Sequence, residues 1–138
     1  NIDLEALLPY VDVFMPNRTE LLHLTRTKSV KDGINALKAF ANVIVVKDGT
    51  NGAALFRNGN IERQPAFLNS EAIDAIGAGD SFDAGFIFKY IQNLPLDECL
   101  KFGNLTGAIN TTEAGGTTAF ESIEKIKEIA QKRFAYDI

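Results

Sequence analysis

The segment Asp74-Ala-Ile-Gly-Ala-Gly-Asp80 decides how this chain of 138 residues is interpreted. Two glycines flank Ala78 and let the backbone turn tightly, and an apolar run that predicts a helix follows. The first N–H groups of a helix have no acceptor within the helix, and they face outward with the positive end of its dipole. We therefore expect an anion in front of Gly77, Ala78 and Gly79, above all one whose charge grows during phosphoryl transfer.

Buried strands alternate with amphipathic helices on both sides of this segment, which indicates an α/β layered fold. Asn17 stands just before the first helix with Glu20 three residues later, the spacing of a capping box. Strand patterns are predicted at 11–14, 42–47, 53–56 and 61–65, and helix patterns at 18–25, 30–41, 78–92, 95–111 and 121–134.

Composition excludes several classes of protein. The net charge is −4 without a long run of like charges, so we expect no nucleic-acid partner. A single cysteine rules out an internal disulfide, and no apolar stretch reaches the roughly 20 residues of a membrane helix. The first residues are unlike a signal peptide, and the chain does not begin with Met. We expect a cytoplasmic enzyme piece that belongs to a longer protein.

The longer string from Asp74 to Phe88 resembles the C-terminal signature of the ribokinase/PfkB carbohydrate kinase family, Asp-Thr-x-Gly-Ala-Gly-Asp-x-Phe-x-x-Gly. Other segments resemble the family in the same order, namely 17–20 (Asn-x-x-Glu), 45–52 (Gly-x-x-Gly after a strand), and 102–104 with 114–116 around the adenine. The resemblance implies a ribokinase-like layered α/β sandwich with a central, mostly parallel sheet. Residues 1–138 would be its C-terminal nucleotide-binding and catalytic part, without the N-terminal sugar-binding and lid part.

The resemblance also assigns chemical roles around Asp80. This carboxylate would be the general base that takes the proton from the sugar hydroxyl, while Gly77, Ala78 and Gly79 would form the anion hole. The chemistry of phosphoryl transfer is consistent with these roles, since it depends on positioning and on stabilising the developing charge. The alternative for Asp80 is a simple favourable contact of a carboxylate with a helix N-terminus.

ATP and Mg²⁺ are the cofactors that the resemblance implies. Asn17 and Glu20 would act on Mg²⁺ through its waters, although a helix N-cap pair is an alternative that can hold at the same time. Lys47 would border the nucleotide, or it would be an exposed lysine at the end of a strand. The residues expected along the nucleotide are Asn17, Lys47, Gly49, Gly52 and Asn104.

A potassium site is a further implication of the resemblance, with Asp74, Ile76 and Gly116 as its candidate residues. The family favours Thr and then a small polar residue after the aspartate, whereas this chain has Ala75 and Ile76. A backbone carbonyl at 76 remains able to bind K⁺, but a hydroxyl ligand is missing. Activation by a monovalent cation therefore stays open.

The function implied is transfer of the γ-phosphate of ATP to a hydroxyl of a sugar, as in ribokinase or fructokinase, and the full-length protein is a candidate homodimer. We expect the isolated chain to be inactive, because the sugar contacts lie in the missing half. Two alternatives stay open: a nucleoside or vitamin kinase of the same superfamily, and a non-catalytic nucleotide-sensing module. A dinucleotide-binding oxidoreductase is excluded, because Phe82 stands where its third glycine would be.

Overall fold

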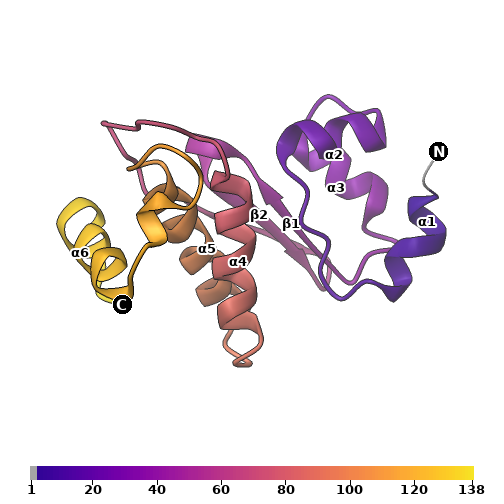
Figure 1. Ribbon diagram of the computed structural model, residues 1–138. Coiled ribbons are helices and arrows are strands. Elements are labelled where there is room, and N and C mark those ends of the chain that lie inside the picture. The colour runs from indigo at the N-terminus through magenta and orange to yellow at the C-terminus, as the bar shows by residue number, and fades with distance from the viewer. Residues whose placement is uncertain (1–2) are drawn as a thin grey trace. The chain divides into compact units, whose positions relative to one another are not determined.

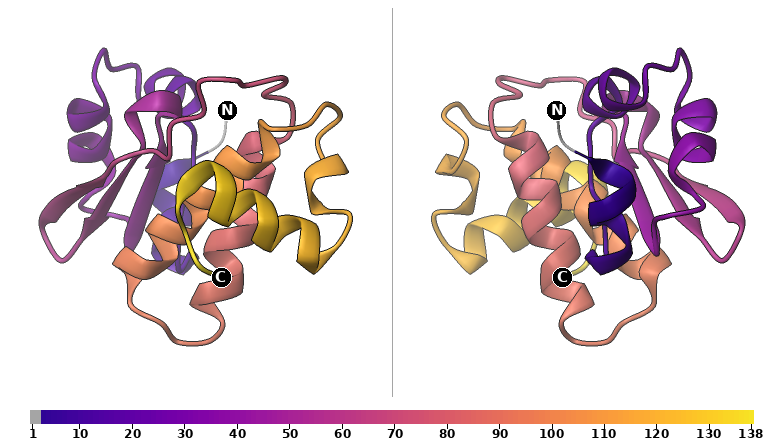
Figure 2. Two further views of the ribbon diagram at one scale, coloured as in Figure 1. Left: turned by 90° about the vertical axis from the view of Figure 1, so that its left-hand side faces the viewer. Right: turned by 90° about the vertical axis from the view of Figure 1, so that its right-hand side faces the viewer.

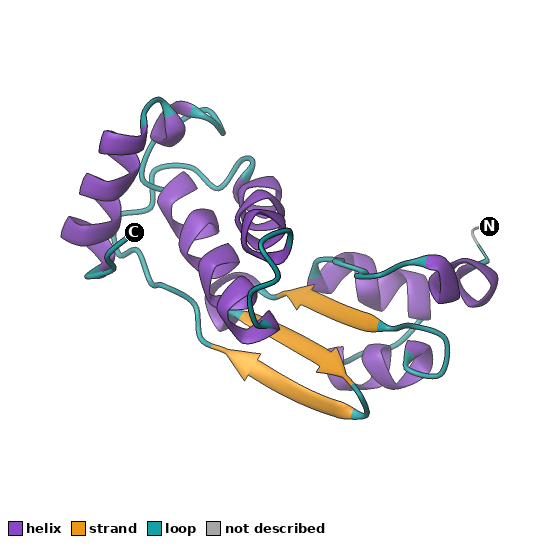
Figure 3. Cartoon of the chain, turned by 90° about the horizontal axis from the view of Figure 1, so that it is seen from below, coloured by secondary structure: helices purple, strands orange, loops and turns teal. Residues whose placement is uncertain are grey.

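The computed structural model describes residues 3–138, and its sheet has three strands in the order β1 (Val43–Lys47), β2 (Ala53–Arg57) and β3 (Asn60–Gln64). Neighbouring strands run in opposite directions, as the arrows in Figure 3 show. Val45 lies opposite Leu55 in this register, and both are almost completely buried. The continuous apolar runs of β1 and β2 therefore form the interior of the sheet.

This antiparallel pairing differs from the mostly parallel sheet that we expected. The physical reason is the length of the connections, since parallel strands need a crossover of a dozen or more residues. β1 and β2 are joined by a short turn that contains η2 (Gly49–Asn51), and β2 and β3 by Asn58 and Gly59. Parallel pairing among residues 3–138 occurs in two isolated bridges, Phe14 with Ile44 and Asn17 with Lys47.

The chain forms two compact units, Asn1–Gln64 and Pro65–Ile138. In the first unit, α2 (Arg18–Thr25) and α3 (Val30–Leu37) lie side by side along one face of the sheet (Figure 1). Leu21 of α2, Ile34 of α3 and Ile44 of β1 meet in its core and are fully buried. The helical segments of this unit are α1 (Leu4–Leu7), η1 (Leu8–Tyr10), α2 (Arg18–Thr25) and α3 (Val30–Leu37).

The second unit is built on the packing of α4 (Ala78–Tyr90) against α5 (Leu96–Asn110), which the views in Figure 2 show lying against each other. Glycines make this close approach possible. A Cβ added at Gly85 would lie 2.1 Å from Thr106 Oγ1, and one at Gly103 would lie 3.0 Å from the Phe82 ring. Each helix thus places a glycine against a side chain of the other.

The C-terminal part of the chain folds onto α5. It contains η3 (Thr118–Phe120) and α6 (Ile123–Phe134). Ala130 of α6 packs with Phe102, Leu105 and Ile109 of α5 in a second core. Phe67, in the segment before α4, meets the ring of Tyr136 edge-on at 5.8 Å between ring centroids. This aromatic contact holds Phe67 against the C-terminal end of the chain.

The longest helix of residues 3–138 is α5, with 15 residues. None of the helices in this range combines the length and the apolar composition that crossing a bilayer requires.

Candidate active site

The tight turn at Gly77 sets the start of α4. Its backbone is left-handed, with φ of +76°, a conformation that favours glycine. A Cβ at this position would lie 3.1 Å from the Cα of Gly116, which forms a left-handed pair with Gly115. The turn before α4 and the loop after α5 are therefore in direct backbone contact, and the two glycines allow it.

The backbone N–H groups at the start of α4 differ in their hydrogen bonding. Ala78 donates its N–H to the carbonyl of Ala75 at 3.2 Å, so this expected member of the anion hole is already engaged. Gly79 and Asp80 follow in the first turn, where the helix contains no i−4 acceptor, and both residues are exposed. An anion in front of α4 would therefore meet the amides of Gly79 and Asp80 first, beside the Asp80 carboxylate.

Asp74 connects this turn to the loop after α5 that contains Gly115 and Gly116, called the glycine loop below. Its Oδ1 accepts the N–H of Ile76 at 2.9 Å, and its Oδ2 accepts the N–H of Gly115 at 3.2 Å. These two backbone hydrogen bonds hold the pKa of Asp74 below its ordinary value of 3.8, because they favour the ionised form. Asp74 is thus an ionised clamp between the two backbone segments at neutral pH.

Replacing Asp74 by Asn is expected to remove a stabilising contribution that depends on pH. Because the pKa is lowered in the folded state, ionised Asp74 stabilises that state above pH 3.8 and stops doing so as the pH falls through its folded-state pKa. Melting temperatures of the full-length wild type and Asp74→Asn should therefore converge as the pH falls below 3.8. A difference in melting temperature that stays constant into acid would contradict this role.

In the first unit, the start of α2 carries the predicted capping box, which is confirmed. Asn17 Oδ1 accepts the N–H of Glu20 at 2.8 Å, and Glu20 Oε2 accepts the N–H of Asn17 at 2.8 Å. The bridge between Asn17 and Lys47 then brings this cap beside the end of β1, where the Lys47 N–H donates to the Pro16 carbonyl at 3.0 Å. A helix start and a strand end thus meet at one place.

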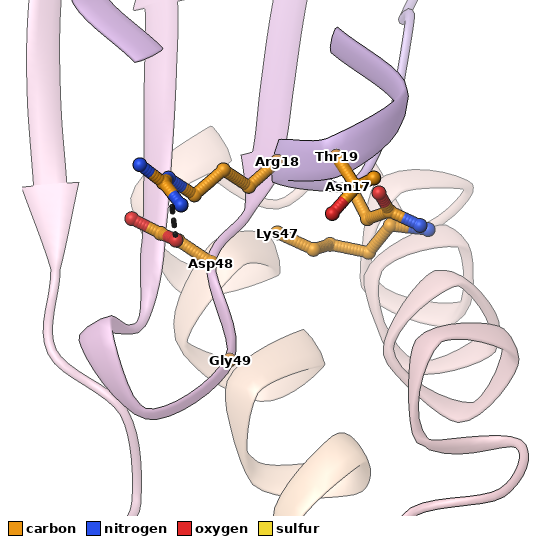
Figure 4. A pocket seen from close by; sticks show the side chains of 6 residues that line it. All are labelled: Asn17, Arg18, Thr19, Lys47, Asp48 and Gly49. Atoms are coloured by element: carbon orange, nitrogen blue, oxygen red, sulfur yellow. Dashed lines mark ion pairs between the residues drawn. The ribbon is translucent and has the colours of Figure 1, made fainter. Parts of the chain in front are cut away.

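A cavity of about 280 Å³ lies at this meeting point. Figure 4 shows the Lys47 side chain extending toward Asn17, whereas Arg18 reaches over to Asp48. The residues that line the cavity are Asn17, Arg18, Thr19, Lys47, Asp48 and Gly49. Its lining has two cationic side chains against one carboxylate, which favours an anionic ligand.

Asp48 is the carboxylate in the wall of this cavity. Its side chain is only 10% exposed and lies between two arginines, with Asp48 Oδ1 at 3.7 Å from Arg18 Nε and Oδ2 at 3.8 Å from an Arg63 guanidinium nitrogen. Buried carboxylates are stable only when they are paired in this way. The arginine pair therefore neutralises Asp48 and leaves the wall of the cavity cationic.

Comparison with known proteins shows the family to which this chain belongs. Residues 2–123, most of the chain, match the family described as pfkB family carbohydrate kinase. The chain belongs to the PfkB family. The ribokinase of Haemophilus influenzae is 28% identical over 134 residues, which cover 92% of this chain and 43% of that protein.

Solved structures show the same fold for this PfkB-family chain. The adenosine kinase of Sinorhizobium meliloti matches with a TM-score of 0.80 and 26% identity, over 94% of this chain and 39% of that one. A double mutant of Vibrio cholerae fructokinase, bound to fructose, ADP and potassium ion, matches with a TM-score of 0.77 and 26% identity, over 88% and 41% of the two chains. The chain spans about two fifths of the length of the curated relatives it matches.

Within each unit of this PfkB-family chain, the structure brings together most of the predicted site residues. In the first unit, Asn17, Lys47 and Gly49 line the cavity, and Glu20 is bonded to Asn17. Gly52, at φ of +82°, ends the same turn but does not line the cavity. In the second unit, the residues that gather at the start of α4 are Asp74, Ile76, Gly77, Ala78, Gly79, Asp80 and Gly116.

Asn104 lies apart from this group in the PfkB-family chain. It sits within α5, is 8% exposed, and donates from Nδ2 to the Pro65 carbonyl at 3.2 Å. Sequence reasoning did not single out Asp48 or Asn110 for the site. Their partners lie far away in the sequence, so no local pattern pointed to either residue. No group of three His, Cys, Asp or Glu side chains within residues 3–138 is arranged to hold a metal ion.

Proposed function

We propose that this chain is the C-terminal, catalytic half of a PfkB-family kinase that transfers the γ-phosphate of ATP to a sugar hydroxyl. The observation that carries the proposal is the start of α4. There the exposed Asp80 lies in the first turn, among backbone amides that directly follow the left-handed turn at Gly77. Such a helix start stabilises an anion, and a carboxylate beside it is positioned to accept a proton.

Asp80 is the proposed general base, and the turn of Gly77, Ala78 and Gly79 is the proposed anion hole. Catalysis of this kind depends on positioning and electrostatic stabilisation, because phosphoryl transfer requires little covalent chemistry by the protein. The clamp by Asp74 supports the proposal, since it fixes the backbone on which both groups depend. The amide of Ala78 joins the hole only if its bond to Ala75 opens.

The cavity at the start of α2 is the proposed place of the ATP phosphates. Asn17 and Lys47 would contact them from the cap of α2 and the end of β1, and Gly49 would let the nucleotide approach the turn. Lysine is a common partner of phosphate in nucleotide sites. Gly52 and Asn104 are proposed as nucleotide contacts on the family resemblance alone.

Mg²⁺ is the proposed cofactor at the same cavity, where it would neutralise charge on the phosphates. The donor set fits an ion held mainly by phosphate oxygens and waters, because Glu20 is an exposed carboxylate and one of its oxygens is already bonded to the Asn17 N–H. Asn17 and Glu20 would therefore orient the waters of the ion instead of binding it directly.

Potassium is a further proposed ligand, near Asp74, Ile76 and Gly116. The fructokinase of Vibrio cholerae that shares this fold has been solved with potassium ion. The ionised carboxylate of Asp74 favours a cation nearby. The Gly116 carbonyl accepts a hydrogen bond from Asn110 Nδ2, and its second lone pair is what a cation would use.

A nucleoside is the second candidate acceptor, and one observation favours it. The adenosine kinase of Sinorhizobium meliloti matches this chain as well in fold and identity as the fructokinase does. The residues that would discriminate between a sugar and a nucleoside acceptor belong, on this proposal, to the part of the relatives that this chain does not span.

A panel of acceptors tests the proposal. The full-length protein would be mixed with ATP and, in turn, with ribose, fructose, adenosine, cytidine or pyridoxal, while ADP release is measured. We expect turnover with a sugar by the full-length protein and none from the 138-residue chain alone, because on this proposal the acceptor site lies in the part of the relatives that this chain does not span. Turnover by the isolated chain would contradict its role as one half of the enzyme. Binding of ATP without turnover of any acceptor would favour a nucleotide-sensing module.

A further inference from the structure

We propose that Asn110 is a positioning residue, which holds the start of α4 and the glycine loop in the geometry that catalysis needs. The inference rests on the proposed function, because it assigns a role around the Asp80 site. Asn110 is the last residue of α5 and is 2% exposed. Nothing in its own helix explains why a buried polar side chain stands there.

The Asn110 amide joins two backbone segments that are far apart in the sequence. Its Nδ2 donates to Ser81 Oγ at 3.0 Å and to the carbonyl of Gly116. Ser81 directly follows Asp80, so one of these bonds acts on the first turn of α4 next to the proposed base. The other bond holds the loop against which Gly77 packs.

The geometry around Gly77 places this amide directly against the turn. A Cβ added at Gly77 would lie 3.5 Å from Asn110 Nδ2 and 3.1 Å from the Cα of Gly116. The glycine loop is thus held at two successive residues, the N–H of Gly115 by Asp74 and the carbonyl of Gly116 by Asn110. Asp74 restrains the loop on the partly exposed side, and Asn110 restrains it from the interior.

The orientation of the amide follows from its partners. If Oδ1 and Nδ2 of Asn110 were exchanged, Oδ1 would face the Gly116 carbonyl, and two acceptors would repel each other. With Nδ2 placed there, Oδ1 is the one buried side-chain polar atom within residues 3–138 that lacks a hydrogen-bond partner. An apolar side chain would avoid this unfavourable burial, so the two bonds from Nδ2 are what distinguishes Asn at this position.

Variants of the full-length protein test the role, with ATP and the best acceptor of the panel as substrates. Asn110→Ala removes both bonds, and Asn110→Asp keeps the shape but turns an acceptor toward the Gly116 carbonyl, although the Ser81 hydroxyl can still donate to it. We expect each to lower kcat by about 10- to 100-fold, with the KM for ATP changed less than about threefold, because misplacement of a reacting group by about 1 Å has effects of this size. Ser81→Ala removes one bond and is expected to lower kcat by a smaller factor.

Thr112→Val is the matched control. Thr112 is 4% exposed and lies just beyond the same end of α5, but its hydroxyl bonds only to the Ile109 carbonyl of its own helix, at 2.8 Å. We expect its kcat to stay within about twofold of wild type, since the bond does not reach α4. A fall in kcat equal to that of the Asn110 variants would show a general effect of polar burial and overturn the proposal.

The remaining outcomes are also decisive. All assays are run below the melting temperature of each variant, and folding is checked by circular dichroism. Folded Asn110 variants with kcat near wild type, or with a change in the KM for ATP alone, would overturn the positioning role. If the Asn110 variants do not fold, Ser81→Ala decides in the same way. Asp80→Asn in the same assay separates the two proposals, because full activity there contradicts the function itself.

Discussion

Asp80→Asn is expected to lower kcat of the full-length protein by about 10²- to 10⁴-fold, the usual contribution of a positioned general base. Asparagine has nearly the shape of aspartate but cannot take a proton from the acceptor hydroxyl. Asp80 is exposed and lies in the first turn of α4, so the substitution should leave the fold intact. The KM for ATP should change little, since the proposed phosphate contacts of ATP lie on other residues.

A matched variant separates base catalysis from the electrostatics of the helix start. Asp97 is also an exposed aspartate in a first helical turn, that of α5. Both Asn variants remove a favourable contact with a helix dipole, which contributes about 0.3–1 kcal/mol. Melting temperatures should therefore fall by similar small amounts, whereas kcat should fall only for Asp80→Asn. Near-wild-type activity of Asp80→Asn would overturn the assignment of the base.

Gly85→Ala is expected to have the largest effect on stability. The new Cβ would lie 2.1 Å from Thr106 Oγ1 and 2.8 Å from Thr106 Cγ2, closer than atoms can approach. Thr106 cannot simply turn away, because its hydroxyl donates to the Ser81 carbonyl at 2.7 Å and the residue is 7% exposed. Overpacking of this kind costs about 1–3 kcal/mol. The higher helix propensity of Ala, about 1 kcal/mol, offsets part of this cost.

A double-mutant cycle in the full-length protein locates the clash. Thr106→Ala alone should destabilise the fold, since it removes the bond to Ser81 and leaves space between α4 and α5. The double variant Gly85→Ala with Thr106→Ala should be more stable than the sum of the two single effects, because the new methyl group then fills that space. Strictly additive melting data, or a Gly85→Ala variant as stable as wild type, would contradict this account of helix packing.

Local chemistry made much of the architecture predictable from the sequence. The Asn17 and Glu20 pair was predicted as a capping box, and both of its bonds are present. Gly77 was predicted to precede a helix, and α4 begins at Ala78. These features depend on residues within a few positions of each other, where spacing and backbone preference determine the conformation.

The sequence did not predict contacts between residues that are far apart in the chain. The pairing of Asp48 with Arg63 and the bond from Asn110 to Ser81 join residues 15 or more positions apart, and no spacing rule connects them. The antiparallel sheet was missed for a different reason. The hairpin predicted at 53–65 is present as β2 and β3, but β1 also pairs antiparallel with β2, and parallel pairing is limited to the two isolated bridges of β1.

The cap of α2 has a consequence for the entropy of ligand binding. The side chains of Asn17 and Glu20 are already fixed by each other's backbone amides, so neither loses rotamer freedom when a ligand enters the neighbouring cavity. Immobilising a flexible side chain costs about 0.5–1.5 kcal/mol of binding free energy. The bond pattern that stabilises the helix start therefore already holds Asn17, one wall of the cavity, before a ligand arrives.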